Sequence, residues 1–300
     1  MNAAYLCSEA SKPRNRRART ARFVGSLAMA GVLGITLWTD QANALTGKPV
    51  LHAHRAIYDM SLGESDDTSG ISGVTGRMVF EFSGSACEGY TVNFRFLTRI
   101  ESDEGASRVT DLRTSSFEKG DGGAFQFINK TYIDKVLAEE SHGQAERDGD
   151  EISVDLERPK KEKFGVQKTA LFPTEHLLEI ISKAQQGTNF LQADVYDGSE
   201  DGHKVFATTS VIGGIKSRVQ PVNDENEVGV GALEGMKYWP VTIAYFDLEN
   251  ERQGETTPIY ELEFELFENG VSGGLNMKYG DFTVRGELKE IEFLASEKCE

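Results

Sequence analysis

Apolar and polar residues alternate along much of this chain of 300 residues, and this period of two is the feature that most restricts its fold. The clearest segment is 260–266, in which Tyr260, Leu262, Phe264 and Leu266 alternate with three glutamates. Successive side chains of a β-strand point to opposite faces, so each such segment buries one face and exposes the other. The same alternation occurs at 90–97, 152–156 and 282–294. The pattern predicts a mainly β protein.

Turns rich in glycine and acidic residues separate these segments. They lie at 103–105, 119–123, 148–150 and 268–270. Short turns of this composition join strands that are neighbours in a sheet. We therefore expect roughly a dozen strands, mostly antiparallel and connected in chain order.

One segment breaks the period of two and is predicted to be a helix. Residues 173–187 start with a proline, which suits the first turn of a helix, and end at Gly187, which suits its stop. Leu177, Ile181 and Ala184 recur at helical spacing, so this face should pack on a sheet. The fold therefore contains one or a few short helices.

Residues 1–44 have the parts of an export signal. Five arginines between positions 14 and 22 precede an apolar run at 23–38, and Ala42-Asn43-Ala44 offers small residues for cleavage after Ala44. The apolar run is shorter than the roughly 20 residues of a membrane span. The alternative is an uncleaved N-terminal anchor. We predict a cleaved signal peptide, 1–44, and a single β-rich periplasmic domain, 45–300, that does not span the membrane.

Removal of the signal makes the chain strongly acidic. Of 32 Lys and Arg residues and 48 Asp and Glu residues, six and two lie in the first 44 positions, which leaves 26 and 46. The resulting net charge near −20 repels nucleic acid and anionic lipid headgroups, so we expect no nucleic-acid partner.

An outer-membrane barrel would also be exported and rich in strands. Such barrels carry girdles of aromatic residues and are expected to end on one. This chain ends in Glu297-Lys298-Cys299-Glu300 and contains two tryptophans, one of them at position 38. We therefore expect a protein outside the bilayer.

Two cysteines, Cys87 and Cys299, remain after the signal with Cys7 is removed. An even pair in an oxidising compartment is most simply a disulfide. The alternative is a redox or metal-binding pair, but the chain has no Cys-x-x-Cys, and two thiolates make a poor metal site. We predict a structural disulfide that closes the domain.

The search for catalytic and metal-binding chemistry gives only weak candidates, since the common nucleophile, zinc and nucleotide motifs are missing. His52 and His54 could chelate a metal from one strand face, but two surface histidines are the simpler interpretation. His176 could be a general acid or base, although a packing or hydrogen-bonded histidine fits better. Residues 197–202 imitate the start of a calcium loop, yet Thr208 stands where a bidentate glutamate belongs, so an Asx-rich turn is favoured. We predict no catalytic residues, metal or cofactor.

Several segments, in this order and spacing, resemble the EipB-type cell-envelope integrity family of alphaproteobacteria. They lie at 54–59, 76–82, 87–93, 172–176 and 195–202. The resemblance covers the chain from about Leu51 to Cys299. It implies a soluble periplasmic protein that supports the cell envelope under stress, and a spiral or open barrel-like arrangement of antiparallel strands. It also implies one disulfide, at positions that match Cys87 and Cys299, and it supplies no catalytic residues.

Two classes of function remain open. A non-enzymatic envelope factor would act through periplasmic protein partners or by handling a lipid or lipoprotein on a concave apolar surface. An unrecognised hydrolase of envelope polymers would need paired carboxylates in a cleft. An apolar cavity would favour the first class, and converging carboxylates with shifted pKa values would favour the second.

Overall fold

The structure is a computed structural model that describes residues 49–218, 228–247, 257–296 and 299. The proposed signal peptide, 1–44, lies outside these residues. The described chain forms fifteen strands, one α-helix and one 3₁₀ helix. In chain order they are β1 (His54–Ser65), β2 (Ile71–Ser85), β3 (Gly89–Ser102), β4 (Ser107–Glu118), β5 (Ala124–Ile133), β6 (Val136–Asp148), β7 (Glu151–Arg158), β8 (Glu162–Gln167), α2 (Pro173–Gln185), β9 (Phe190–Val195), β10 (Phe206–Ile212), β11 (Lys216–Ser217), η1 (Val230–Leu233), β12 (Lys237–Phe246), β13 (Tyr260–Phe267), β14 (Ser272–Tyr279) and β15 (Phe282–Phe293).

All of the strands belong to one antiparallel sheet. Its order is β8-β7-β6-β5-β4-β3-β2-β1-β15-β14-β13-β12-β10-β9, and the short β11 pairs with β12. Strand β1 pairs with β2 on one side and with β15 on the other, so the first and last strands meet in the middle of the sheet. The prediction of a mainly β, open barrel-like fold is confirmed, with fifteen strands where roughly a dozen were expected.

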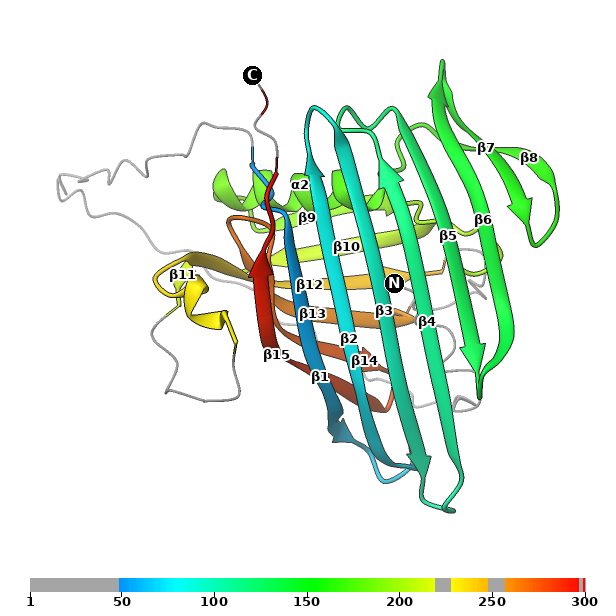
Figure 1. Cartoon of the computed structure of the whole chain (residues 1–300), viewed down its shortest axis with the longest axis vertical. Coiled ribbons are helices and arrows are strands. Elements are labelled where there is room, and N and C mark those ends of the chain that lie inside the picture. Colours follow the sequence, from blue (N-terminus) through cyan, green and yellow to red (C-terminus); the bar gives the residue numbers. More distant parts are fainter. Residues whose placement is uncertain (1–48, 219–227, 248–256, 297–298, 300) are drawn as a thin grey trace, which may run out of the picture.

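The sheet bends into two layers. The long strands β1–β6 form one layer, and β9, β10 and β12–β15 cross behind them (Figure 1). A single buried apolar cluster takes side chains from both layers, among them Tyr58, Phe94, Trp239 and Met277. A second cluster lies under β5–β8 and includes Phe125, whose ring stacks on Phe172 in the segment between β8 and α2, and Phe127, whose ring packs on Tyr196.

The alternation at 260–266 has the structural role that the sequence predicts. Tyr260, Leu262, Phe264 and Leu266 are buried, whereas the three glutamates between them are partly exposed. The buried face of each strand contributes side chains to the cluster between the layers. Burial of one large apolar side chain contributes roughly 1.5–3 kcal/mol to the stability of the fold. The hydrophobic period thus decides which face of each strand points inward.

Helix α2 spans 173–185, close to the predicted 173–187, and lies against β9 and β10. Ile180, Ile181 and Ala184 are buried, while Leu177 is partly buried against the same cluster. No helix in the described ranges is long and apolar enough to cross a membrane.

Cys87 and Cys299 form a disulfide with a Cα–Cα distance of 5.7 Å. Cys87 lies in the turn 86–88 between β2 and β3, and Cys299 follows β15. The bond ties the end of the chain to the layer that contains β2 and β3. It joins residues 212 positions apart, so it constrains nearly the whole unfolded chain after the proposed cleavage site.

We expect Cys87→Ser and Cys299→Ser to lower the melting temperature of the purified chain by the same amount. Loop closure of this length contributes at most about 5 kcal/mol, which is comparable to the stability of a whole domain. Thermal unfolding of both variants measures this, and reductant should shift the wild type but not the double variant. Two variants that melt like the wild type would contradict a stabilising role.

Candidate functional site

A cavity of about 220 Å³ lies between the two layers, next to helix α2. Strands β2–β5 and β12, the first turns of α2 and the loop 196–204 all contribute to its wall. Most of the wall is apolar, and its main side chains are Phe80, Phe82, Val92, Phe94, Phe125 and Leu177. The cavity brings together segments that are far apart in the sequence.

The apolar wall follows from the alternation of neighbouring strands. Phe80 and Phe82 are two residues apart on β2, as are Val92 and Phe94 on β3, so each pair shares the inward face. The register places Phe80 opposite Phe94 and Phe82 opposite Val92. Strand pairing alone therefore builds a continuous apolar surface across the two strands.

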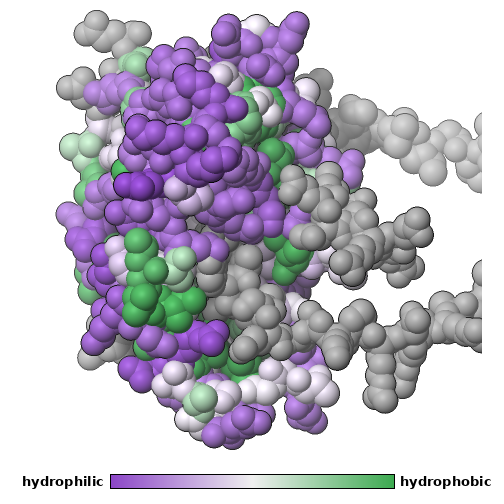
Figure 2. All heavy atoms as spheres, turned by 90° about the vertical axis from the view of Figure 1, so that its right-hand side faces the viewer, coloured by the Kyte–Doolittle hydropathy of each residue, from purple (hydrophilic) through white to green (hydrophobic). Residues whose placement is uncertain are grey.

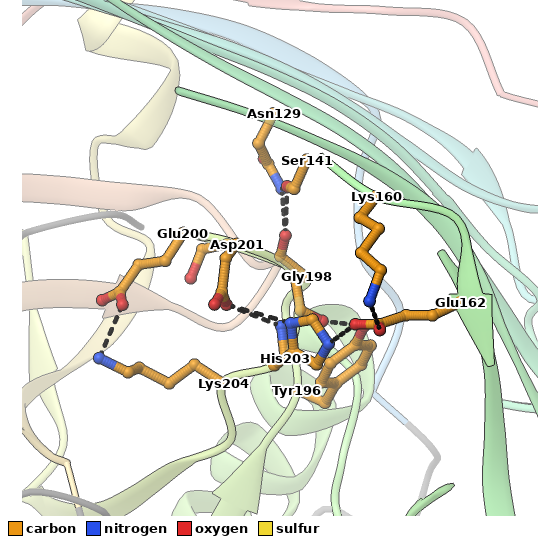
Figure 3. A network of polar contacts seen from close by, with 12 residues as sticks. Asn129, Ser141, Lys160, Glu162, Tyr196, Gly198, Glu200, Asp201, His203 and Lys204 are labelled. Atoms are coloured by element: carbon orange, nitrogen blue, oxygen red, sulfur yellow. Dashed lines mark hydrogen bonds and ion pairs between the residues drawn. The ribbon is translucent and has the colours of Figure 1, made fainter. Parts of the chain in front are cut away.

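The polar end of the cavity is built by the 196–204 loop, which lies between β9 and β10. The Gly198 carbonyl accepts hydrogen bonds from Asn129 Nδ2 at 2.9 Å and from Ser141 Oγ at 2.5 Å (Figure 3). Asn129, Asp197 and Ser199 all line the cavity. Strands β5 and β6 thus hold the loop against the cavity through its backbone.

Gly198 has a φ of +65°, and a Cβ atom there would lie 2.4 Å from the ring of Phe127. Only glycine combines a left-handed backbone at low cost with so close an approach to a ring. The loop therefore packs directly on the second apolar cluster, and its position is fixed by packing as well as by hydrogen bonds.

The rest of the loop is held by a network of polar contacts. Lys204 Nζ lies 2.7 Å from Glu200 and 2.9 Å from Asp247, and the Tyr196 hydroxyl donates to the Gly202 carbonyl at 2.7 Å. The His203 ring contacts Glu162 of β8 (Figure 3). These contacts connect the loop to β8 and to Asp247, directly after β12.

The loop is the Asx-rich turn that the sequence favours. Asp197 Oδ1 accepts from the Ser199 N–H at 2.9 Å, and Asp201 Oδ1 accepts from the His203 N–H at 3.1 Å. Glu200 pairs with Lys204, an ammonium group, where a calcium loop would direct its oxygens to the ion. Within the described ranges, no group of three or more His, Cys, Asp or Glu side chains is placed to hold a metal ion.

Glu118, at the end of β4, anchors helix α2. Its carboxylate accepts hydrogen bonds at 2.8 Å from the backbone N–H groups of Thr174 and Glu175, which have no partner within the helix. Burial raises the pKa of Glu118 to about 7, because desolvation outweighs the hydrogen bonds to its charged form. The first turn of α2, which lines the cavity, is therefore positioned by a buried carboxyl group.

His176 is a packing histidine, as the sequence suggests. It is buried, its Nε2 lies 3.4 Å from Thr208 Oγ1, and burial lowers its pKa to about 4. The ring is therefore neutral at pH 7.

The prediction of two surface histidines near the N-terminus is wrong for His54. His52 is exposed, but His54 is only 2% exposed, and its ring lies 5.7 Å from that of Phe80 and 6.0 Å from that of Phe82. Its Nδ1–H donates to the His52 carbonyl at 2.7 Å. The physical reason is that His54 lies on the inward face of β1, which it shares with Ala56 and Tyr58, so its ring packs against the two phenylalanine rings of β2.

A carboxyl group with a shifted pKa also lies outside the cavity. Burial raises the pKa of Glu139 to about 7, and the negative charges of Glu200 and Asp201 add to this effect. Glu139 is on β6 and does not line the cavity. Among the described residues of the cavity wall, Asp197 is the one ionisable carboxylate.

The sequence did not reveal Glu118, Asn129 or Ser141 as parts of this site. Each is a single polar residue on a strand, and the backbone group that it binds in α2 or in the 196–204 loop lies 56 or more positions away along the chain. The one local signal was polar residues at positions 118, 129 and 141, where the alternation places buried side chains. A buried polar group of this kind needs a partner, but the pattern cannot say which.

Comparisons with known proteins agree with this structure. A family model described as EipB-like matches residues 46–295. The cell envelope integrity protein EipB of Brucella abortus (strain 2308) is 44% identical over 273 residues, which are 90% of this chain and 95% of that protein. A crystal structure from Brucella abortus, described as a β-barrel-like protein of a domain of unknown function, is 45% identical with a TM-score of 0.75 and covers 82% of this chain and 99% of its own.

We expect Glu118→Gln to change how stability depends on pH. The pKa of Glu118 is raised from 4.5 to about 7, so its contribution to stability is complete below about pH 4.5 and is lost as the pH rises through 7. The variant lacks this titration, so its stability relative to the wild type should rise by up to about 3 kcal/mol from pH 4.5 to pH 7.5. Urea unfolding across this range measures the difference. Glu179→Gln, a change at a half-buried position on helix α2, should show no such trend. If both variants behave alike, the assignment to Glu118 is wrong.

We expect Gly198→Ala to destabilise the chain by more than 2 kcal/mol, since the new Cβ meets the Phe127 ring and the backbone is left-handed. Gly187→Ala is the matched control, because Gly187 also has a positive φ of +74° but has no atom within 4 Å of the new Cβ. The Gly187→Ala variant should lose only about 1 kcal/mol of stability. If thermal or urea unfolding shows equal losses of stability for the two variants, contact with Phe127 does not hold the loop.

Proposed function

Because this chain belongs to the EipB-like family, we propose that it is a non-enzymatic periplasmic factor that supports the integrity of the cell envelope. The family relationship rests on the match over 46–295 and on 44% identity to a cell envelope integrity protein. The export signal predicted at 1–44 and the disulfide between Cys87 and Cys299 support a periplasmic location, since disulfides persist in oxidising compartments.

We propose further that the protein handles a lipid or the lipid part of a lipoprotein. The observation that carries this proposal is the cavity between the layers, which has an aromatic and aliphatic wall and a small polar end. Sites for small molecules commonly combine a mainly apolar lining with a few polar groups that fix orientation. The face shown in Figure 2 is mainly hydrophilic and carries a smaller hydrophobic patch.

Binding of a protein partner is a second way to perform the same function. One edge of the sheet is suited to such a partner. Strand β9 is an edge of the sheet, and on its neighbour β10 the exposed Val211 lies opposite the exposed Phe190. The bridge between Leu171 and Val195 covers only one end of β9. An edge strand with apolar side chains can accept a further strand from a partner.

The alternative of a hydrolase receives less support from the geometry. Hydrolysis of a glycosidic bond uses two carboxyl groups that face the same substrate. The described cavity wall contains one, Asp197, while Glu118 is occupied by the N-terminus of α2 and Glu139 lies elsewhere. The non-enzymatic function is therefore the one that we propose.

A cavity-filling variant tests this proposal. We expect Val92→Phe, which places a larger side chain in the wall, to reduce rescue of detergent resistance in a strain that lacks the native gene. Val136→Phe is the matched control, because Val136 is 70% exposed on β6, and it should rescue fully. The periplasmic amount and melting temperature of each variant must be measured, since overpacking costs about 1–3 kcal/mol. Full rescue by a folded Val92→Phe chain would contradict a role for the cavity.

A further inference from the structure

We propose that the edge of β9 beside helix α2 binds an extended segment of a partner protein, which has apolar side chains at alternate positions and a Lys or Arg next to Asp194. This inference rests on the protein-partner part of the proposed function and specifies the chemistry of the partner. Three features of the described residues support it: open backbone groups on β9, a groove between β9 and α2, and the charge of that groove.

The backbone of β9 directs open groups away from β10. On the β10 side, the Ile212 N–H donates to the Asn189 carbonyl at 2.9 Å. On the opposite side, the Leu171 N–H donates to the Asp194 carbonyl at 2.8 Å and covers only this end of β9. Successive residues of an antiparallel strand direct their backbone groups to opposite sides, so Gln192 turns its N–H and C=O away from β10. Within the described ranges, no strand pairs with these two groups.

The opposite edge of the sheet is protected by charge, and β9 is not. Strand β8 contains Glu162 and Lys163, and two further lysines directly precede it. Charged side chains, above all Lys, keep an edge strand from pairing with other chains. Residues 190–193 of β9 contain no charged side chain. Strand β9 is therefore the edge that is suited to accept a further strand.

A groove of about 730 Å³ lies beside this edge. Its wall includes residues 191–194 of β9, residues 207–209 of β10, and Glu175 and Glu179 of α2. Figure 1 shows α2 beside β9. PDZ and PTB domains bind extended peptides by adding them as a strand to a sheet edge, with pockets for alternate side chains. Residues 190–194 extend over about 17 Å, so the groove can hold about five residues of such a strand.

The outward side chains of β9 define what the partner presents. Phe190 lies opposite Val211 of β10, and these side chains are 47% and 51% exposed. They favour an apolar side chain on the added strand, since neighbouring side chains on one face of a sheet pack together. Two and four positions further along β9, the same face carries Gln192 and Asp194. The partner therefore needs an alternating pattern with an apolar residue at one end and a cation at the other.

The charge of the groove favours a cation and opposes a second copy of this chain. Glu175, Glu179 and Asp194 line the groove, and none of its described lining residues is Lys, Arg or His. The first two carboxylates have cationic neighbours, Arg147 and Lys183, whereas Asp194 has no ion pair among the described residues. A Lys or Arg of the partner would supply the missing charge. A second copy would add its own carboxylates and its strongly negative net charge.

Three peptides test the inference on the purified chain after signal removal, by calorimetry at physiological salt. The first, acetyl-Lys-Thr-Val-Thr-Val-Thr-Lys-amide, reads the same in both directions and so fits either orientation of the added strand. The second is N-methylated at its three central residues, which removes the donors that pairing needs and keeps the side chains. The third has Gln in place of both lysines. We expect the first peptide to bind about threefold or more tighter than the second, and about twofold to fivefold tighter than the third.

Gln192→Pro should weaken binding of the first peptide about threefold or more, because proline removes the N–H that points to the open edge. This N–H takes no part in the pairing with β10, and an edge strand tolerates proline at such a position, so the melting temperature should stay close to that of the wild type. Gln192→Ala is the matched control, because it keeps the N–H and changes only an exposed side chain. It should bind the peptide like the wild type.

Asp194→Asn tests the charge of the groove. This variant should bind the Lys peptide and the Gln peptide equally, because the carboxylate that favours the cation is gone. Asp67→Asn is the matched control, since Asp67 is exposed in the turn between β1 and β2 and its change alters the net charge by the same amount. The control should keep the preference for the Lys peptide.

The outcomes separate this inference from the rest of the proposed function. Equal binding of the first and second peptides, full binding by a folded Gln192→Pro chain, or failure of all three peptides to bind overturns strand addition at β9. An unchanged preference for Lys in Asp194→Asn overturns the assigned charge. Sedimentation of the chain alone must show a monomer, because a dimer that Gln192→Pro abolishes would make a second copy the occupant and overturn the inference. Handling of a lipid in the cavity is decided separately, by rescue with Val92→Phe.

Discussion

The pairing of β1 with β15 is the constraint on which the rest of the structure depends. The sheet consists of two runs of strands in chain order, β1–β8 and β9–β15, and within the described ranges these runs are joined as neighbouring strands where β1 meets β15. The register extends from His54 opposite Phe293 to Ser65 opposite Phe282. Without this contact the two layers would not face each other, and neither the shared apolar cluster nor the cavity would exist. Contacts between such distant parts of a chain are slow to form, because loop-closure entropy must be overcome first.

The 196–204 loop is the second element on which the site depends, because it forms the polar end of the cavity. It brings the Gly198 backbone carbonyl into a largely apolar region, where Asn129 of β5 and Ser141 of β6 donate hydrogen bonds to it. Buried polar groups that are hydrogen-bonded in this way fix a unique arrangement. The loop therefore has one position relative to β5 and β6, and the polar end of the cavity is fixed with it.

The fold could be predicted from the sequence wherever the signal is local. The period of two at 260–266 depends only on the geometry of one strand, and the proline and glycine around 173–187 depend only on one helix, so both were found. The buried position of His54 could not be found, because it depends on neighbours from both ends of the chain. The same holds for Glu118, which acts as an acceptor for a helix 56 positions later. Composition cannot supply such pairings, since 46 acidic residues follow position 44 and the sequence does not say which distant group any of them binds.

The disulfide imposes an order of events on every newly made chain. Cys87 precedes Cys299 by 212 positions, and strands β3–β15 lie between them. The thiol of Cys87 can therefore pair with that of Cys299 only after all of these strands have been synthesised. The bond thus marks a chain in which the whole sheet has been made.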